Sequence, residues 1–71
     1  MNDDSILIKV NGESRRLSVG VTLDDLVREL GFEKRRVAVE RNLDVVRRAD
    51  FPNTLLVAGD QIEIVTFVGG G

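Results

Sequence analysis

Residues 62–71 read IEIVTFVGGG, and this stretch decides both the fold and the way the chain ends. Its β-branched and aromatic residues predict a strand over 62–68. Apolar side chains stand on both faces of that strand, which is typical of a central strand of a sheet. The following Gly69-Gly70-Gly71 adds nothing to a core and loses much backbone entropy when it is ordered. We therefore expect a rigid central strand that delivers a thin, flexible tail into solvent.

A second central strand is expected at residues 5–10, SILIKV, with Ile6, Ile8 and Val10 on one face. The next two residues, Asn11-Gly12, are the strongest short signal for a hairpin, because a type I′ turn needs positive φ at both central positions. The return strand is expected over 14–19, with its apolar side chains directed inward. Placed side by side, the first and last strands run parallel, since the whole intervening chain connects them.

One helix is expected over residues 23–30. Thr22 and Asp25 have the spacing of a capping box, in which each side chain bonds the backbone amide of the other. Gly31 supplies the positive φ that ends many helices. The apolar positions repeat at helical spacing and form one stripe that must pack on the sheet, with Leu26 and Leu30 fully buried. These positions are Leu23, Leu26, Val27 and Leu30.

The rest of the chain predicts shorter elements. A strand is expected over 37–39, a turn at 42–44 and a short edge strand over 45–46. Residues 47–58 are expected to form a loop with one helical turn, and Leu55, Leu56 or Val57 fills the core beneath it. One helix covering one face of a mixed four- to five-stranded sheet is an α+β roll. We expect a single domain over 1–68 and a flexible tail over 69–71.

Composition limits the function. The chain has 71 residues, no cysteine and a net charge of −2 with a pI near 5.0. This rules out a disulfide framework and argues against a basic nucleic-acid binder. No apolar stretch approaches the ~20 residues of a membrane span. The first residues are acidic where a secretory signal would be basic, so we expect a cytoplasmic protein. We also expect no membrane or nucleic-acid partner, and a monomer when the protein is free.

The chemistry available to the chain is equally narrow. It contains no His, Cys, Tyr or Trp, so the usual general base, thiol nucleophile and imidazole metal ligands are missing. We expect no catalytic residue, no metal site and no bound cofactor, and hence a protein that takes part in chemistry done by other enzymes. Three arginine pairs, at 15–16, 35–36 and 47–48, are interpreted as solvated surface, because twelve acidic residues offset them.

Several stretches resemble the ThiS family of sulfur carriers, a prokaryotic branch of the ubiquitin-like β-grasp superfamily. They are residues 39–42 (VERN), 59–65 (GDQIEIV) and 67–71 (FVGGG), and the Asn11-Gly12 hairpin and the helix start at Thr22 match as well. The resemblance extends from about residue 6 to Gly71. It implies a β-grasp fold, in agreement with the pattern of strands and helix.

The resemblance also implies a mechanism. An ATP-dependent, E1-like adenylyltransferase (ThiF-like) activates the Gly71 carboxylate as an acyl adenylate. A sulfur donor such as a cysteine desulfurase then leads to a C-terminal thiocarboxylate, which thiazole synthase (ThiG-like) uses in thiamine biosynthesis. Gly69 and Gly70 would pass through a narrow channel of the partner. Two alternatives stay open: a molybdopterin-synthase sulfur-carrier subunit, and a ubiquitin-like binding module or protein modifier.

A docking patch is expected beside the tail. If Ile62 and Ile64 face the helix, alternation places Val65 and Phe67 on the open face of the sheet. Exposed apolar residues next to a reacting terminus indicate a surface for a partner. We predict that Val65, Phe67 and Val68 form this patch together with Ala38.

Overall fold

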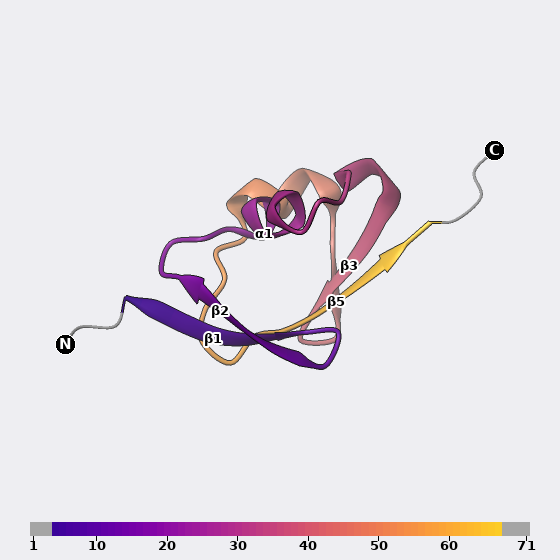
Figure 1. The fold of residues 1–71 in the computed structure, drawn as a ribbon. Coiled ribbons are helices and arrows are strands. Elements are labelled where there is room, and N and C mark those ends of the chain that lie inside the picture. The colour runs from indigo at the N-terminus through magenta and orange to yellow at the C-terminus, as the bar shows by residue number, and fades with distance from the viewer. Residues whose placement is uncertain (1–3, 68–71) are drawn as a thin grey trace.

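The computed structural model describes residues 4–67. These residues form a five-stranded mixed sheet in the order β2-β1-β5-β3-β4, and one helix, α1, packs on one face (Figure 1). This confirms the predicted α+β architecture. The elements are β1 (Ser5–Val10), β2 (Glu13–Ser18), α1 (Leu23–Glu29), the 3-10 helix η1 (Lys34–Arg36), β3 (Val37–Arg41), β4 (Asp44–Val46), the 3-10 helix η2 (Arg48–Asn53) and β5 (Gln61–Thr66).

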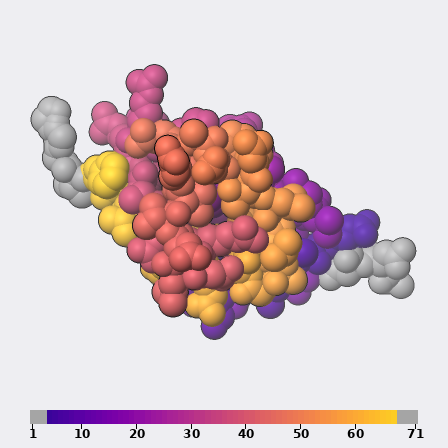
Figure 2. Space-filling view, turned by 180° about the vertical axis from the view of Figure 1, so that it is seen from behind, coloured from indigo at the N-terminus to yellow at the C-terminus, as the bar shows by residue number. Residues whose placement is uncertain are grey.

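The central position of β5 is confirmed. It runs parallel to β1, with Val10 opposite Ile62, and antiparallel to β3, with Val39 opposite Ile64. Ile62 and Ile64 are buried beneath the helix. Figure 2 shows the end of β5, in yellow, at one edge of the molecule. The strand β5 therefore crosses the middle of the sheet and ends at the edge of the molecule.

The predicted hairpin turn is present between β1 and β2. Asn11 has φ 51° and Gly12 has φ 85°, the two positive values that a type I′ turn requires. The return strand ends one residue earlier than expected, at Ser18. Val19 is 63% exposed, so its predicted inward position is wrong. Its backbone N–H donates to the Asp4 carbonyl at 2.8 Å, and Gly20 then turns the chain away from the sheet.

Both halves of the capping box are present at the start of α1. The Asp25 N–H donates to Thr22 Oγ1 at 3.1 Å, and the Thr22 N–H donates to Asp25 Oδ2 at 3.0 Å. Leu26 is completely buried, as predicted. Leu30 is only partly buried, so that half of the prediction is wrong: the helix ends at Glu29, and Leu30 is its C-cap at the border of the core.

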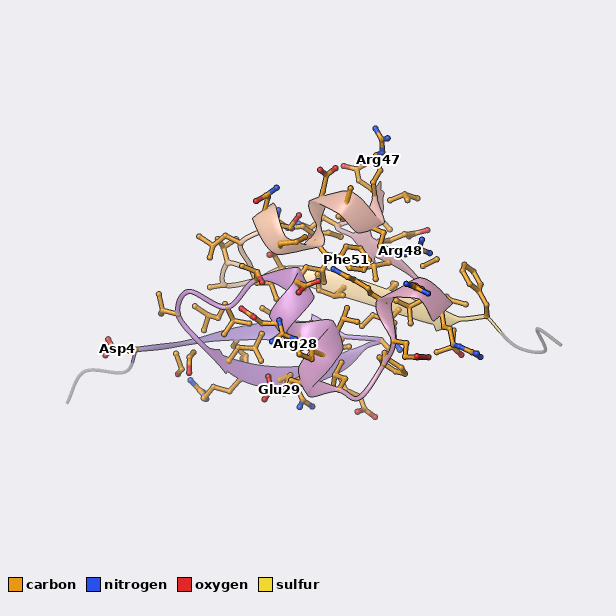
Figure 3. The ribbon with its side chains drawn as sticks, turned by 90° about the horizontal axis from the view of Figure 1, so that it is seen from above. Asp4, Arg28, Glu29, Arg47, Arg48 and Phe51 are labelled. Carbon is orange, nitrogen blue, oxygen red and sulfur yellow. The ribbon has the colours of Figure 1, made fainter. Side chains whose placement is uncertain are left out.

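Residues 42–60 hold the largest departure from expectation. The structure confirms an edge strand, β4, and a helical turn, η2, and Leu56 fills the core as one of the three candidates. The core also contains Phe51, which is 1% exposed and was not predicted. Figure 3 shows Phe51 toward the middle of the molecule, whereas Arg47 projects outward. The 3-10 helix η2 therefore contributes Phe51 to the core, although its other five residues are exposed.

Candidate functional site

The end of β5 is attached to η1. The Phe67 N–H donates to the Arg36 carbonyl at 2.8 Å. The guanidinium of Arg48 binds η1. Its Nε donates to the Lys34 carbonyl at 2.9 Å, and its Nη2 donates to the Arg35 carbonyl at 3.2 Å. Phe67, the last residue that the structure describes, is therefore bonded to η1, which Arg48 stabilises. Val68 and Gly69, Gly70 and Gly71 lie outside the described residues.

The predicted patch residues that the structure describes lie together. Ala38 and Val65 are directly opposite each other on β3 and β5, and both are exposed. Val65 is 60% exposed and Phe67, two residues further on, is 56% exposed. All three side chains are on the sheet face that α1 leaves open. Whether a partner binds them stays a prediction.

Two further apolar residues extend this face and were not predicted. Leu43, in the turn between β3 and β4, is 87% exposed, and Val45 on β4 is 73% exposed. With Ala38 and Val65 they line a shallow hollow of about 380 Å³. Leu43 and Val45 are two residues apart, and this spacing could have indicated that they share a face. Which face of the sheet they occupy depends on how β4 pairs with β3. We call the surface formed by Ala38, Leu43, Val45, Val65 and Phe67 the open apolar face.

Two asparagines hold β5 from its two sides. On the β1 side, the Asn11 side chain bonds the backbone of Ile64. On the β3 side, the Asn42 N–H donates to the Gln61 carbonyl at 2.8 Å, and Asn42 Oδ1 accepts from the Gln61 N–H at 2.9 Å. Both asparagines occupy turns at positive φ. Each turn thus fixes the position of the central strand as well as the direction of its own hairpin.

Asp60 is the one buried charged residue among those that the structure describes. Its carboxylate accepts hydrogen bonds from the Val57 N–H at 2.9 Å, from Asn42 Nδ2 at 3.1 Å and from Arg41 Nε at 3.1 Å. Burial raises the pKa of Asp60, but these three donors and the Arg41 charge lower it more, so the pKa lies below the ordinary value of an aspartate. Asp60 therefore shapes the turn that leads into β5.

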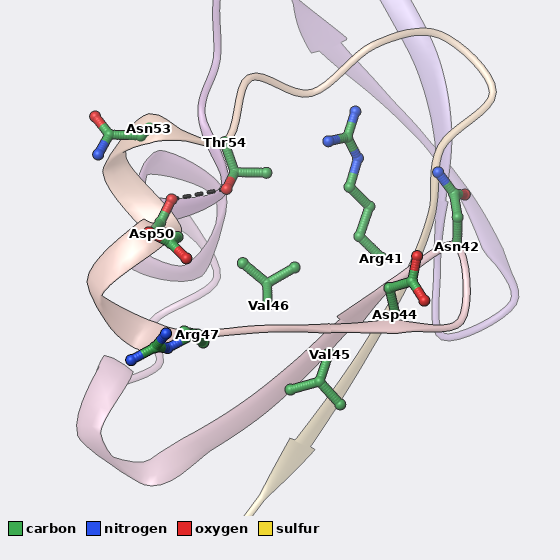
Figure 4. Close-up of a pocket in the computed structure, with 9 residues that line it drawn as sticks. All are labelled: Arg41, Asn42, Asp44, Val45, Val46, Arg47, Asp50, Asn53 and Thr54. Carbon is green, nitrogen blue, oxygen red and sulfur yellow. Dashed lines mark hydrogen bonds between the residues drawn. The ribbon is translucent and has the colours of Figure 1, made fainter.

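A larger hollow lies elsewhere, between β4 and η2, with a volume of about 510 Å³ (Figure 4). Its polar groups are of both signs, with Arg41 and Arg47 near Asp44 and Asp50. Arg41 is already bound to Asp60, and Thr54 Oγ1 donates to the Asp50 carbonyl at 2.7 Å. This mixture of positive and negative side chains favours no single ligand charge.

Among residues 4–67, no group of three or more acidic side chains is gathered as a metal site. Within the same residues, no helix has the length and apolar character needed to cross a membrane.

Comparison with known proteins identifies the family. The model of the ThiS family matches residues 8–71, nearly the whole chain. The chain belongs to the ThiS family. The sulfur carrier protein ThiS of Thermus thermophilus is 35% identical over 65 residues, which are 92% of this chain and 100% of that protein. The family assignment agrees with the resemblance found in the sequence.

Two similar proteins are much longer. The thiazole synthases of Paramagnetospirillum magneticum and Magnetococcus marinus are 45% and 47% identical, over 87% and 90% of this chain. The chain spans only about a fifth of the length of these two relatives, 19% and 20%. A ThiS-like segment is therefore present within each of these longer proteins.

Solved structures agree on the fold. The crystal structure of the thiamine biosynthesis protein ThiS from Geobacter metallireducens superposes with a TM-score of 0.79 at 29% identity, covering 93% of this chain and 100% of that one. A protein designed on the template of human ubiquitin gives a TM-score of 0.54 at 20% identity, which shows the ubiquitin-like fold alone. The described residues thus have the ubiquitin-like fold of a ThiS protein.

Proposed function

We propose that this protein is a sulfur carrier of thiamine biosynthesis, with the Gly71 carboxylate as the group that carries sulfur. The observation that carries the proposal is the ThiS family match, which extends through Gly71. The whole-length similarity to the ThiS of Thermus thermophilus supports it. The geometry of β5 supports it as well, because this central strand leaves the sheet beside a braced support and an exposed apolar face.

The chemistry needs an activating partner. A free carboxylate is a poor electrophile, so an E1-like adenylyltransferase joins the Gly71 carboxylate to the α-phosphorus of ATP and releases pyrophosphate. The persulfide of a donor such as a cysteine desulfurase then attacks the acyl carbonyl and expels AMP, and a thiol cleaves the resulting acyl disulfide to leave the thiocarboxylate and a disulfide. A glycine carbonyl suits both steps, because no Cβ obstructs the attack. Gly69 and Gly70 allow the main chain to pass through a narrow channel to the nucleotide.

The consumer of the sulfur is a thiazole synthase in this proposal. Two proteins with that name contain a segment similar to this chain, and this similarity supports a thiazole synthase as the partner. This observation favours thiazole formation over a molybdopterin-synthase role, and over a binding module that never carries sulfur.

The direct test is deletion of Gly71. The shortened chain ends one residue, or ~3.5 Å, short of the nucleotide, so we expect no ATP–pyrophosphate exchange with the purified activating enzyme. Gly70→Val is expected to do nearly the same, because a β-branched side chain stiffens the backbone and fills the channel. Glu13→Gln, which changes an exposed side chain on the helix side of the sheet, is the control for exchange. Exchange at the wild-type rate by the shortened chain would end the proposal.

The product itself is measurable. Intact-mass analysis of protein purified from its own cells is expected to show a species about 16 Da heavier than the unmodified chain, since sulfur replaces one oxygen. The species should be absent when the activating enzyme is deleted. A ubiquitin-like binding module would show the unmodified mass in both cells.

A further inference from the structure

Glu40 and Glu63 are direct cross-strand neighbours on the open side of the sheet. The register of β3 and β5 places them opposite each other, and both are exposed. In an antiparallel pair of strands, hydrogen-bonded and non-hydrogen-bonded residue pairs alternate. Arg36–Phe67 and Asn42–Gln61 are hydrogen-bonded, so Glu40–Glu63, which lies an even number of residues from each, is hydrogen-bonded as well. The Cα atoms of such a pair are ~5.5 Å apart. Two like charges at this distance destabilise a sheet.

The rest of the described chain does not neutralise this pair. No salt bridge among residues 4–67 involves Glu40 or Glu63. Arg41 follows Glu40 on β3 but faces the other side of the strand, where it binds Asp60. Lys9 lies on β1 opposite Gln61, two positions along β5 from Glu63, and is diagonal to it. One lysine faces two carboxylates, so the pair keeps a net negative charge and has no ion-pair partner among residues 4–67.

The surroundings of the pair are apolar. The hollow of about 380 Å³ contains Glu40 and Glu63 among the side chains of Ala38, Leu43, Val45 and Val65. Val45 lies directly opposite Glu40 on β4, and Val65 is the next residue after Glu63 on the same face. Leu43 reaches the rim from a backbone at φ 76°, a value that branched side chains rarely adopt. A negative centre with an apolar border is complementary to a cation that is flanked by apolar groups.

We propose that this hollow receives an arginine side chain of the adenylating enzyme, so that charge as well as apolar area determines docking. The inference rests on the proposed function, because it names how the partner recognises the carrier. A guanidinium is planar and carries five N–H donors, enough to bond both carboxylates, and it is more weakly hydrated than an ammonium. Once the partner covers Val45 and Val65, water is displaced and the attraction between guanidinium and carboxylates becomes stronger.

The adenylating enzyme is the partner that the geometry favours. Glu63 and Val65 of β5, and Phe67 directly after it, alternate onto the same face in the direction of the C-terminus. An enzyme that takes up the tail must therefore cover the end of this row. The arrangement costs the free chain stability through repulsion between the two glutamates, which is typical of residues retained for binding.

The test measures stability and docking on the same variants. Glu63→Gln and Glu40→Gln each remove one charge and keep the shape of the side chain. We expect the KM for the carrier in ATP–pyrophosphate exchange to rise about tenfold, with kcat unchanged. The urea midpoint of unfolding is expected to stay level or rise, because the repulsion is gone. The double variant is expected to show a weaker dependence of KM on salt than the wild type.

Glu13→Gln is the matched control. Glu13 is also an exposed strand glutamate, but it pairs with Val10, whose side chain packs against the core, and so it lies on the helix side of the sheet. We expect it to leave KM unchanged. If the Glu63→Gln and Glu40→Gln variants also keep the wild-type KM while the wild type supports exchange, this inference is wrong and the proposed function stands. If Val65→Ser raises KM but the glutamate variants do not, docking is apolar only, and the inference is again wrong.

Discussion

The side chain of Asn11 is paired with the backbone of Ile64, 53 residues further along the chain. Asn11 Oδ1 accepts from the Ile64 N–H at 2.8 Å, and Asn11 Nδ2 donates to the Ile64 carbonyl at 3.2 Å. The backbone pairing of β1 with β5 stops at Ile62. The asparagine side chain therefore replaces the next residue of a strand and supports β5 on the way to the tail.

Replacing this asparagine separates the turn from the support. Asn11→Gly retains a residue that accepts positive φ but leaves both backbone groups of Ile64 without their partner. We expect the free energy of unfolding to fall by ~1–3 kcal/mol, the cost of unsatisfied polar groups. Urea denaturation measures it. A change below ~0.5 kcal/mol would show that water replaces the side chain at no cost.

The exposed turn residue Leu43 predicts a change of opposite sign. Its φ of 76° is strained for a leucine, and glycine is the preferred residue at this position of a type I′ turn. We expect Leu43→Gly to raise the free energy of unfolding by ~1 kcal/mol through relief of that strain. Because the side chain is 87% exposed, little packing is lost. A destabilised variant would indicate that Leu43 packs on its neighbours.

Asp60 predicts acid sensitivity. A carboxyl group whose pKa is lowered by folding stabilises the fold above its unfolded pKa, about 4, and this stabilisation is lost as the pH falls through the folded pKa. We expect Asp60→Asn to lower the free energy of unfolding at pH 7 by ~2–3 kcal/mol, because bonds to a charged group are lost. The difference from wild type should shrink as the pH falls below about 4.

The quantity to measure is the difference in the free energy of unfolding between the wild type and Asp60→Asn, by urea denaturation at each pH. The pKa of Asp24 is lowered by its bond from Lys34, and that of Asp25 by bonds from the Thr22 backbone and hydroxyl, so both titrate in the same acid range. Their contribution is the same in the wild type and in the variant, and it cancels. A difference that stays constant from pH 7 to about 2 would contradict the role of the Asp60 charge.

Two leucines of one helix are expected to differ. Leu26 is completely buried, so Leu26→Ala leaves a cavity and is expected to cost ~2–5 kcal/mol. Leu30 is only partly buried at the border of the core, and Leu30→Ala is expected to cost less than half as much. Thermal or urea unfolding of both variants under the same conditions measures the ratio. Equal losses would place Leu30 in the core after all.

Phe67 predicts a loss of docking without a loss of fold. It is 56% exposed, so Phe67→Ala is expected to weaken binding to the activating enzyme by more than ~1 kcal/mol and to change the free energy of unfolding by less. Phe32→Ala is the matched control, because Phe32 packs against the core and its loss should reduce stability and leave docking unchanged. Reversed results for the two variants would move Phe67 into the core.

The local elements of this fold could be predicted from the sequence. The type I′ turn at Asn11-Gly12 and the capping box of Thr22 and Asp25 depend on residues within a few positions of one another, and the structure has both. Alternation along 62–67 also placed Val65 on the open face, because side chains of a strand point to opposite sides in turn. The parallel pairing of β1 and β5 followed from two apolar strands that both needed a central position.

Tertiary structure decided the features that join distant residues. Asn11 bonds Ile64 across 53 positions, and Arg41 bonds Asp60 across 19, and no local pattern specifies either partner. Phe51 entered the core because η2 packs on α1, and the open apolar face gained Leu43 and Val45 because β4 lies at the edge of the sheet. The sequence determined where turns, caps and faces begin, since these depend on neighbouring backbone angles. Which faces meet depended on how the whole chain buries its apolar surface at once.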